Sequence, residues 1–88
     1  MPVPPYQVVV LDRVAKAIDA LHPEARQRIR SKLAALAGNP RPPGVVRLTG
    51  LEDAYRIRVG DYRIVYAIRD QELLVLILRV GHRREVYD

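Results

Sequence analysis

The 88-residue chain contains no cysteine, which excludes a disulfide framework, a cysteine-ligated zinc or iron–sulfur site and a thiol nucleophile. None of its apolar runs approaches the roughly 20 residues that a membrane helix needs. Residues 1–5 lack the charged and apolar regions of a signal peptide. We therefore expect one domain spanning residues 1–88, located in the reducing cytoplasm, with no membrane partner.

The sequence also lacks the motifs of several enzyme classes. There is no Walker-type loop and no GxGxxG motif. Ser31 is the only serine and falls in the middle of a predicted helix, so a Ser-His-Asp triad has no support. No group of aspartate, glutamate and histidine has the spacing of a metal site. We expect neither a metal nor a cofactor.

Basic residues outnumber acidic ones by 15 to 10, and 13 of the 15 are arginine. A net charge of +5 favours a polyanionic partner, which is a nucleic acid, an anionic membrane surface or an acidic protein. The planar guanidinium group also matches the geometry of phosphate. An arginine-rich composition is equally typical of a GC-rich genome, so the charge alone does not name the partner.

The first half of the sequence predicts a strand followed by two helices. Residues 6–11 are β-branched and short, which favours a strand. Asp12 is a candidate cap for a helix that runs to about Leu21. A second helix is predicted from Pro23 to Gly38, and His22 before it is a capping or surface residue. We expect these helices to form a hairpin.

The second half predicts strands over residues 45–48, 55–59, 62–69 and 73–80, with Gly81 ending the last. The last strand is nearly all apolar, which predicts cover on both of its faces. The predicted fold class is α+β, in the order β-α-α-β-β-β, with three or four antiparallel strands after the helices. The helical hairpin packs on the tyrosine and isoleucine face of a small antiparallel sheet and leaves the opposite face open.

Period-2 alternation directs the arginines of the strands to that open face. Arg56 and Arg58 alternate with apolar residues, and Arg63 follows the turn with the parity that returns it to the same side. Arg79 is a candidate fourth member. Clustered like charges repel, which favours an anion as the usual occupant. The alternative is a solvated face, with ion pairs to Glu52, Asp61, Asp70 and Glu72.

Such a cluster suits metal-free RNA cleavage, in which a 2′-hydroxyl attacks its own 3′-phosphate. The reaction needs stabilisation of the phosphorane charge, a base and an acid. Arginines supply the first, and His82 is the candidate that titrates near neutrality. Tyr87 is a candidate to orient, to donate a proton or to stack on a base. Further candidate RNA contacts are Arg79, Arg84 and Arg47.

Two segments carry a family resemblance: the hairpin YRIRVGDYRIVY (residues 55–66) and the ending LRVGHRREVY (residues 78–87). They resemble the RelE/ParE toxin superfamily, RelE-like branch, and the similarity covers nearly the whole chain. It implies a RelE-like microbial RNase fold and the toxin of a type II toxin–antitoxin system. Such a toxin is a ribosome-dependent endoribonuclease that cleaves mRNA in the A site, beside 16S rRNA, and stops translation. It also implies a cognate antitoxin as partner.

By this resemblance the family's functional positions fall on Arg56, Arg58, Arg63, Arg83 and Tyr87, with His82 beside Arg83. The best-known RelE enzymes have lysine in place of the first two, and one of those lysines is a proposed general base. Arginine is not deprotonated in proteins. Three interpretations follow: His82 is the base, the two arginines act only electrostatically, or activity is weak. Two other functions stay open, a ParE-like toxin that inhibits DNA gyrase and a degenerate homologue that retains antitoxin binding.

Overall fold

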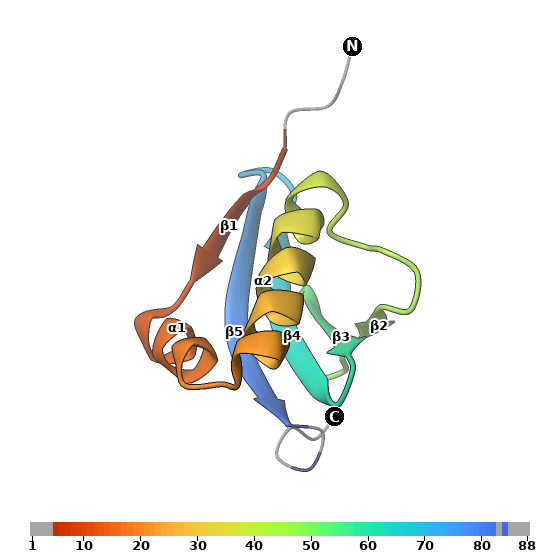
Figure 1. Ribbon diagram of the computed structural model, residues 1–88. Helices are drawn as coiled ribbons and strands as arrows, with labels where there is room; N and C mark the ends of the chain where they lie inside the picture. The colour runs from red at the N-terminus through yellow and green to blue at the C-terminus, as the bar shows by residue number, and fades with distance from the viewer. Residues whose placement is uncertain (1–4, 83, 85–88) are drawn as a thin grey trace.

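The computed structural model describes residues 5–82 and 84. Two helices and five strands follow one another in the order β-α-α-β-β-β-β (Figure 1). Their bounds are β1 Gln7–Val10, α1 Asp12–Asp19, α2 Pro23–Gly38, β2 Val46–Arg47, β3 Ala54–Val59, β4 Tyr62–Arg69 and β5 Leu74–His82. The predicted α+β class is confirmed. The last strand is longer than predicted, because it continues through Gly81 to His82.

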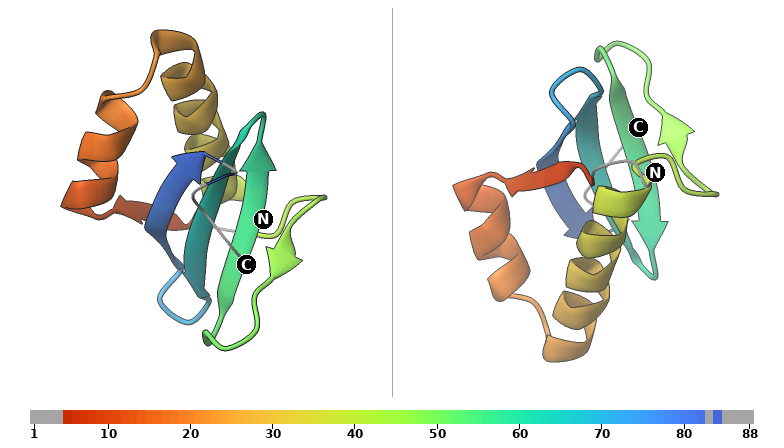
Figure 2. Two further views of the ribbon diagram at one scale, coloured as in Figure 1. Left: turned by 90° about the horizontal axis from the view of Figure 1, so that it is seen from below. Right: turned by 90° about the horizontal axis from the view of Figure 1, so that it is seen from above.

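The five strands form one sheet in the order β1-β5-β4-β3-β2. Neighbouring strands from β2 to β5 are antiparallel, whereas β1 pairs in parallel with β5. The sheet is therefore mixed rather than wholly antiparallel, because the first strand adds to the edge of the last. Both helices lie on one side of this sheet, as Figure 2 shows from two directions. We call the opposite side the outer face.

Local sequence explains where the helices begin and end. The residue preceding α1 is Leu11, which makes no side-chain cap, and Asp12 is the first helical residue. The prediction of Asp12 as the cap is therefore wrong, although its charge still favours the positive end of the helix. The Nδ1 atom of His22 accepts the amide of Glu24 at 3.3 Å, with Pro23 at the first position of α2. The capping interpretation of His22 is confirmed.

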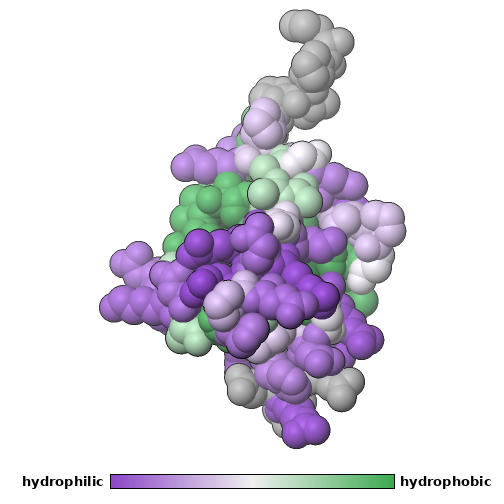
Figure 3. Space-filling view, viewed as in Figure 1, coloured by the Kyte–Doolittle hydropathy of each residue, from purple (hydrophilic) through white to green (hydrophobic). Residues whose placement is uncertain are grey.

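The core lies between the helices and the inner face of the sheet. Its fully buried members include Ile29 and Leu36 of α2, Ile64 of β4 and Ile77 of β5. Three tyrosines are predicted core residues: Tyr55 and Tyr66 are buried, with ring centroids 6.0 Å apart, and Tyr62 is half-buried and packs against the core. Strand β5 is buried mainly at alternate residues, so its outer face is less covered than its apolar sequence predicts. The side of α2 that faces solvent is strongly hydrophilic. Apolar surface lies beside it, over β1 (Figure 3).

Arg41 joins the loop after α2 to the turn between β4 and β5. Two of its guanidinium nitrogens donate to the two carboxylate oxygens of Asp70, at 3.1 and 2.9 Å. Tyr6 donates to the same carboxylate at 2.7 Å, and Arg41 Nε donates to Tyr55 at 3.3 Å. Beneath it, the hydroxyl of Tyr66 donates to the carbonyl of Pro40 at 2.8 Å. These bonds tie together the N-terminal strand, the loop and the β4–β5 turn.

Candidate functional site

Four arginines occupy neighbouring positions on the outer face, and we call them the arginine cluster: Arg56, Arg58, Arg63 and Arg79. Arg58 of β3 lies directly opposite Arg63 of β4. Two residues further along the strands, Arg56 and Arg79 flank Val65 from either side. Neighbouring strands are about 4.8 Å apart and alternate residues about 7 Å apart along a strand. The four guanidinium groups therefore share one small area.

The outward direction of Arg79 depends on an irregularity in β5. Val65 pairs with Arg79 and Tyr66 pairs with Ile77, so Leu78 is an extra residue at this point. Before this β-bulge the odd-numbered residue Ile77 faces the core. After it the even-numbered residue Val80, which pairs with Ile64, faces the core. A bulge re-aims the side chains that follow it, and here it directs Arg79 to the outer face.

The charges of the cluster act on one another. Partial burial and the nearby charge of Arg63 lower the pKa of Arg56. The Nη1 atom of Arg56 and the Nε atom of Arg63 are almost completely removed from solvent. Arg58 is more exposed and donates from Nε to the carbonyl of Gly60 at 3.0 Å. Gly60 has a φ of 58°, which its lack of a side chain permits, so the tight turn itself holds Arg58.

Because of the same bulge, His82 lies on the other side of the sheet. It pairs with Tyr62, and its ring meets the Tyr62 ring edge-on at 5.7 Å between centroids. Its Nδ1 atom accepts the amide of Arg84 at 3.3 Å. The structure therefore does not bring His82 together with the arginine cluster, and its role as a general base stays a prediction. His82 is a candidate because its side chain titrates near neutrality, and nothing in the sequence indicates which face it occupies.

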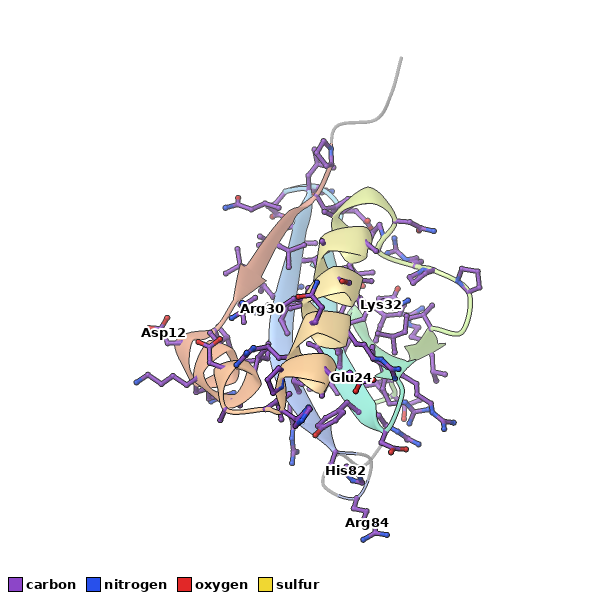
Figure 4. The ribbon with its side chains drawn as sticks, in the orientation of Figure 1. Asp12, Glu24, Arg30, Lys32, His82 and Arg84 are labelled. Carbon is purple, nitrogen blue, oxygen red and sulfur yellow. The ribbon has the colours of Figure 1, made fainter. Side chains whose placement is uncertain are left out.

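The other predicted contacts are distributed differently. Arg47 pairs with Tyr55, whose ring lies in the core, so it faces the helix side and is not part of the arginine cluster. Arg84 is exposed just beyond β5, with its side chain directed away from the fold (Figure 4). The predictions for Arg83 and Tyr87 lie outside the described residues. The structure thus brings four of the predicted residues together.

The alternative interpretation, a solvated face whose arginines pair with nearby carboxylates, does not hold at Asp70. Asp70, one of the predicted partners of the strand arginines, is instead held by Arg41 and Tyr6. Sequence reasoning missed this bidentate pair, because a proline-rich loop gives no periodicity from which to place Arg41. Across residues 5–82 and 84, no three histidine, aspartate or glutamate side chains are grouped so as to hold a metal ion. No helix in that range has the length and apolar character to cross a membrane.

The sequence of this chain matches a known class of protein. The family model described as the ParE toxin of the type II toxin–antitoxin system parDE matches residues 8–87. A putative RelE-like toxin protein of Escherichia coli is 31% identical, over 94% of this chain and 90% of the relative. The mRNA interferase toxin RelE of E. coli K12 is 31% identical, over 86% of this chain and 83% of the relative.

Solved structures agree. The RelE–RelB complex of Pyrococcus horikoshii contains a chain with a TM-score of 0.81 and 29% identity, covering 92% of this chain and 98% of that one. The RelBE2 complex of Mycobacterium tuberculosis gives a TM-score of 0.78 at 28% identity, covering 90% and 99%. The α+β fold is therefore the fold of RelE toxin structures. The chain belongs to the RelE/ParE family of toxins of type II toxin–antitoxin systems, which confirms the family resemblance.

Proposed function

We propose that this toxin is a metal-independent endoribonuclease that cleaves mRNA in the ribosomal A site and thereby stops translation. One observation carries the proposal: four arginines gather on the sheet face that the helices leave open. A relative 31% identical to this chain is named an mRNA interferase, which supports the same activity. The partners that we propose are mRNA with 16S rRNA at the A site, and a cognate antitoxin in the resting cell.

In the proposed reaction the 2′-hydroxyl of one nucleotide loses its proton to solvent water as its oxygen attacks the adjacent phosphorus. The bond to the 5′-oxygen breaks, and that oxygen takes up a proton from water, which leaves a 2′,3′-cyclic phosphate and a 5′-hydroxyl. Negative charge builds on the non-bridging oxygens, where paired guanidinium groups stabilise it most strongly. Arg58 and Arg63 are the proposed pair for this role, because they lie opposite one another. Arg56 and Arg79 supply positive charge for the neighbouring backbone.

The family's lysines are replaced by Arg56 and Arg58 in this chain, and neither arginine gives up a proton. With His82 on the opposite side of the sheet, we propose that the arginine cluster acts electrostatically and by orienting the RNA. Arg83 and Tyr87 keep the functional positions that the family resemblance gives them, and Tyr87 is proposed to orient, to donate a proton or to stack on a base.

Single-turnover cleavage of a defined mRNA on purified, programmed ribosomes tests the proposal. The wild-type toxin is expected to cut within the A-site codon. Arg63→Ala is expected to lower the rate by about 10²–10³, the usual effect of removing one donor to a transition-state oxyanion. Arg69→Ala is the matched control, since Arg69 lies on the same strand but pairs with Asp53 at 3.7 Å.

The family model is described as a ParE toxin, and the gyrase-inhibiting function is therefore the second candidate. The same purified toxin is added to a DNA gyrase supercoiling assay. Inhibited supercoiling together with uncut mRNA on the ribosome would overturn the endoribonuclease proposal. An intact cellular mRNA pool and unaffected supercoiling would instead favour a degenerate toxin that only binds antitoxin.

A further inference from the structure

Arg28 of α2 reaches the turn between β3 and β4. A β-carbon added at Gly60 would lie 3.6 Å from Arg28 Nη1, and among the described residues beyond the neighbours of Gly60 no other atom comes within 4 Å of that position. The second terminal nitrogen, Nη2, donates to the Glu24 carboxylate at 3.2 Å, one helical turn earlier. The guanidinium group of Arg28 is therefore held by its own helix on one side and contacts the turn on the other.

The turn is otherwise separated from the beginning of α2 by a cavity of about 180 Å³, and Ala25, Gly60 and Asp61 are among the residues that line it. Gly60 and Asp61 are exposed. Figure 2 shows from two directions that the turn and the beginning of α2 lie at the same end of the molecule. Because a cavity lies between the two elements, the contact from Arg28 limits how far the turn can move toward the helix.

Gly60 connects Arg28 to the arginine cluster. The Gly60 carbonyl accepts a hydrogen bond from Arg58 Nε at 3.0 Å. Arg58 lies opposite Arg63, and like charges at facing positions repel one another, so the position of this acceptor decides where the Arg58 guanidinium group is held. Contacts thus run without a break from Glu24 through Arg28 and Gly60 to Arg58, from the helix side of the sheet to its outer face.

We propose that Arg28 is a positioning residue of the RNA-cleaving site: it fixes the β3–β4 turn at Gly60, and the Gly60 carbonyl in turn holds Arg58 in place beside Arg63. The inference rests on the proposed endoribonuclease function and adds to it a residue that acts through Arg58 and not by contact with RNA. Loss of Arg28 leaves the charge of the arginine cluster unchanged. It lets the turn and Arg58 move away from the geometry that the transition state needs, and small displacements of this kind slow a reaction.

A double-mutant cycle tests whether Arg28 acts through Arg58. Arg28→Ala removes the contact with Gly60, and Arg58→Lys keeps the positive charge but removes the Nε donor that bonds the Gly60 carbonyl. In single-turnover cleavage at saturating ribosomes, we expect Arg28→Ala to be about fivefold slower than the wild type, the ratio that corresponds to one neutral hydrogen bond. In the Arg58→Lys background we expect the same substitution to leave the rate unchanged, because residues that act through one another do not have additive effects.

Matched controls separate positioning from fold stability and from RNA binding. Arg26→Ala removes the same charge two residues earlier on α2, where Arg26 donates to the Asp19 carbonyl at 3.2 Å, and is expected to leave the rate unchanged. Affinity for programmed ribosomes, and its slope against salt, are expected to be equal in Arg28→Ala and Arg26→Ala. Urea unfolding checks that each variant is folded. Arg28→Met, which keeps the aliphatic part of the side chain, replaces Arg28→Ala if that variant does not fold.

The outcomes distinguish this inference from the proposed function. If the wild type cuts mRNA but Arg28→Ala is as fast, or is slowed equally in both backgrounds, Arg28 does not act through Arg58 and the inference alone is wrong. A salt slope that is lower by about 0.7 in Arg28→Ala than in Arg26→Ala would make Arg28 a phosphate contact, which also overturns it. If the wild type cuts no mRNA on the ribosome, the proposed function fails and the inference fails with it.

Discussion

Arg58 lies directly across the β3–β4 hairpin from Arg63, so a position that usually favours opposite charges holds two of the same sign. Arg56, two residues away on β3, adds a third charge, and its lowered pKa reflects burial together with the charge of Arg63. Like charges at facing positions of neighbouring strands repel one another. The arrangement is favourable when an anion occupies the outer face.

Relief of this repulsion gives the first prediction. Arg58→Gln is expected to raise the midpoint of urea unfolding, because it removes one charge of the opposed pair, and the bond to the Gly60 carbonyl that is lost with it is an exposed one. Added sulfate is expected to stabilise the wild type more than this variant, since the anion has two guanidinium groups to bridge in the wild type only. Equal stabilisation of both proteins by sulfate at matched ionic strength would contradict the prediction.

The β3–β4 hairpin shows how much of the candidate site can be predicted from the sequence. Strict alternation between Tyr55 and Val59, and again from Tyr62, separates an inner from an outer face, and the tight turn fixes the register that opposes Arg58 to Arg63. Hydrophobic periodicity likewise predicts both helices and the side of the sheet that they cover. Local pattern therefore suffices for the fold class and for three of the four clustered arginines.

Strand β5 shows where the sequence is not enough. Its run of apolar residues supports either parity equally well, and no turn residue marks the bulge at Leu78. The bulge is visible only when β4 and β5 are paired. It places the side chain of His82 on the helix side of the sheet. The parallel pairing of β1 with β5 is similarly a long-range contact, which alternation within Gln7–Val10 does not specify.

The bulge leads to the second prediction. Because Arg79 faces outward after it, Arg79→Ala is expected to weaken binding to programmed ribosomes and to lower the slope of log affinity against log salt by about 0.7, the value for one phosphate contact on single-stranded RNA. Arg69→Ala lies on the same face at the other end of β4 and is expected to leave this slope unchanged. Equal slopes for the wild type and Arg79→Ala would show that Arg79 makes no phosphate contact.

The third prediction concerns stability in acid. Hydrogen bonds from Arg41 and then from Tyr6 lower the pKa of Asp70 to about 2, from an ordinary value near 3.8. A carboxylate with a depressed pKa contributes stability that is complete above its unfolded-state value and is lost as pH falls through the folded-state value. The wild type is therefore expected to lose this contribution between about pH 4 and pH 2.

Asp70→Asn tests this contribution directly. The variant is expected to be less stable than the wild type at pH 6, and the difference is expected to shrink as the pH approaches 2. Urea unfolding midpoints at several pH values measure it. Asp61→Asn, in the exposed β3–β4 turn, is the control carboxylate. A difference between Asp70→Asn and the wild type that stays constant from pH 6 to pH 2 would rule out the Arg41 pair as its source.

The fourth prediction concerns the buried hydroxyl of Tyr66. This side chain is fully buried, burial raises its pKa to about 12, and its hydroxyl donates to the carbonyl of Pro40 at 2.8 Å. Tyr66→Phe leaves that buried carbonyl without its donor, which costs about 1–3 kcal/mol of unfolding free energy.

Tyr6→Phe removes a hydroxyl from an exposed bond to Asp70 and is expected to cost less. Urea unfolding of both variants at pH 7 measures the difference. A Tyr66→Phe protein as stable as Tyr6→Phe would mean that water replaces the lost donor, and that the loop carrying Arg41 is held by its own side-chain bonds to Asp70 and Tyr55.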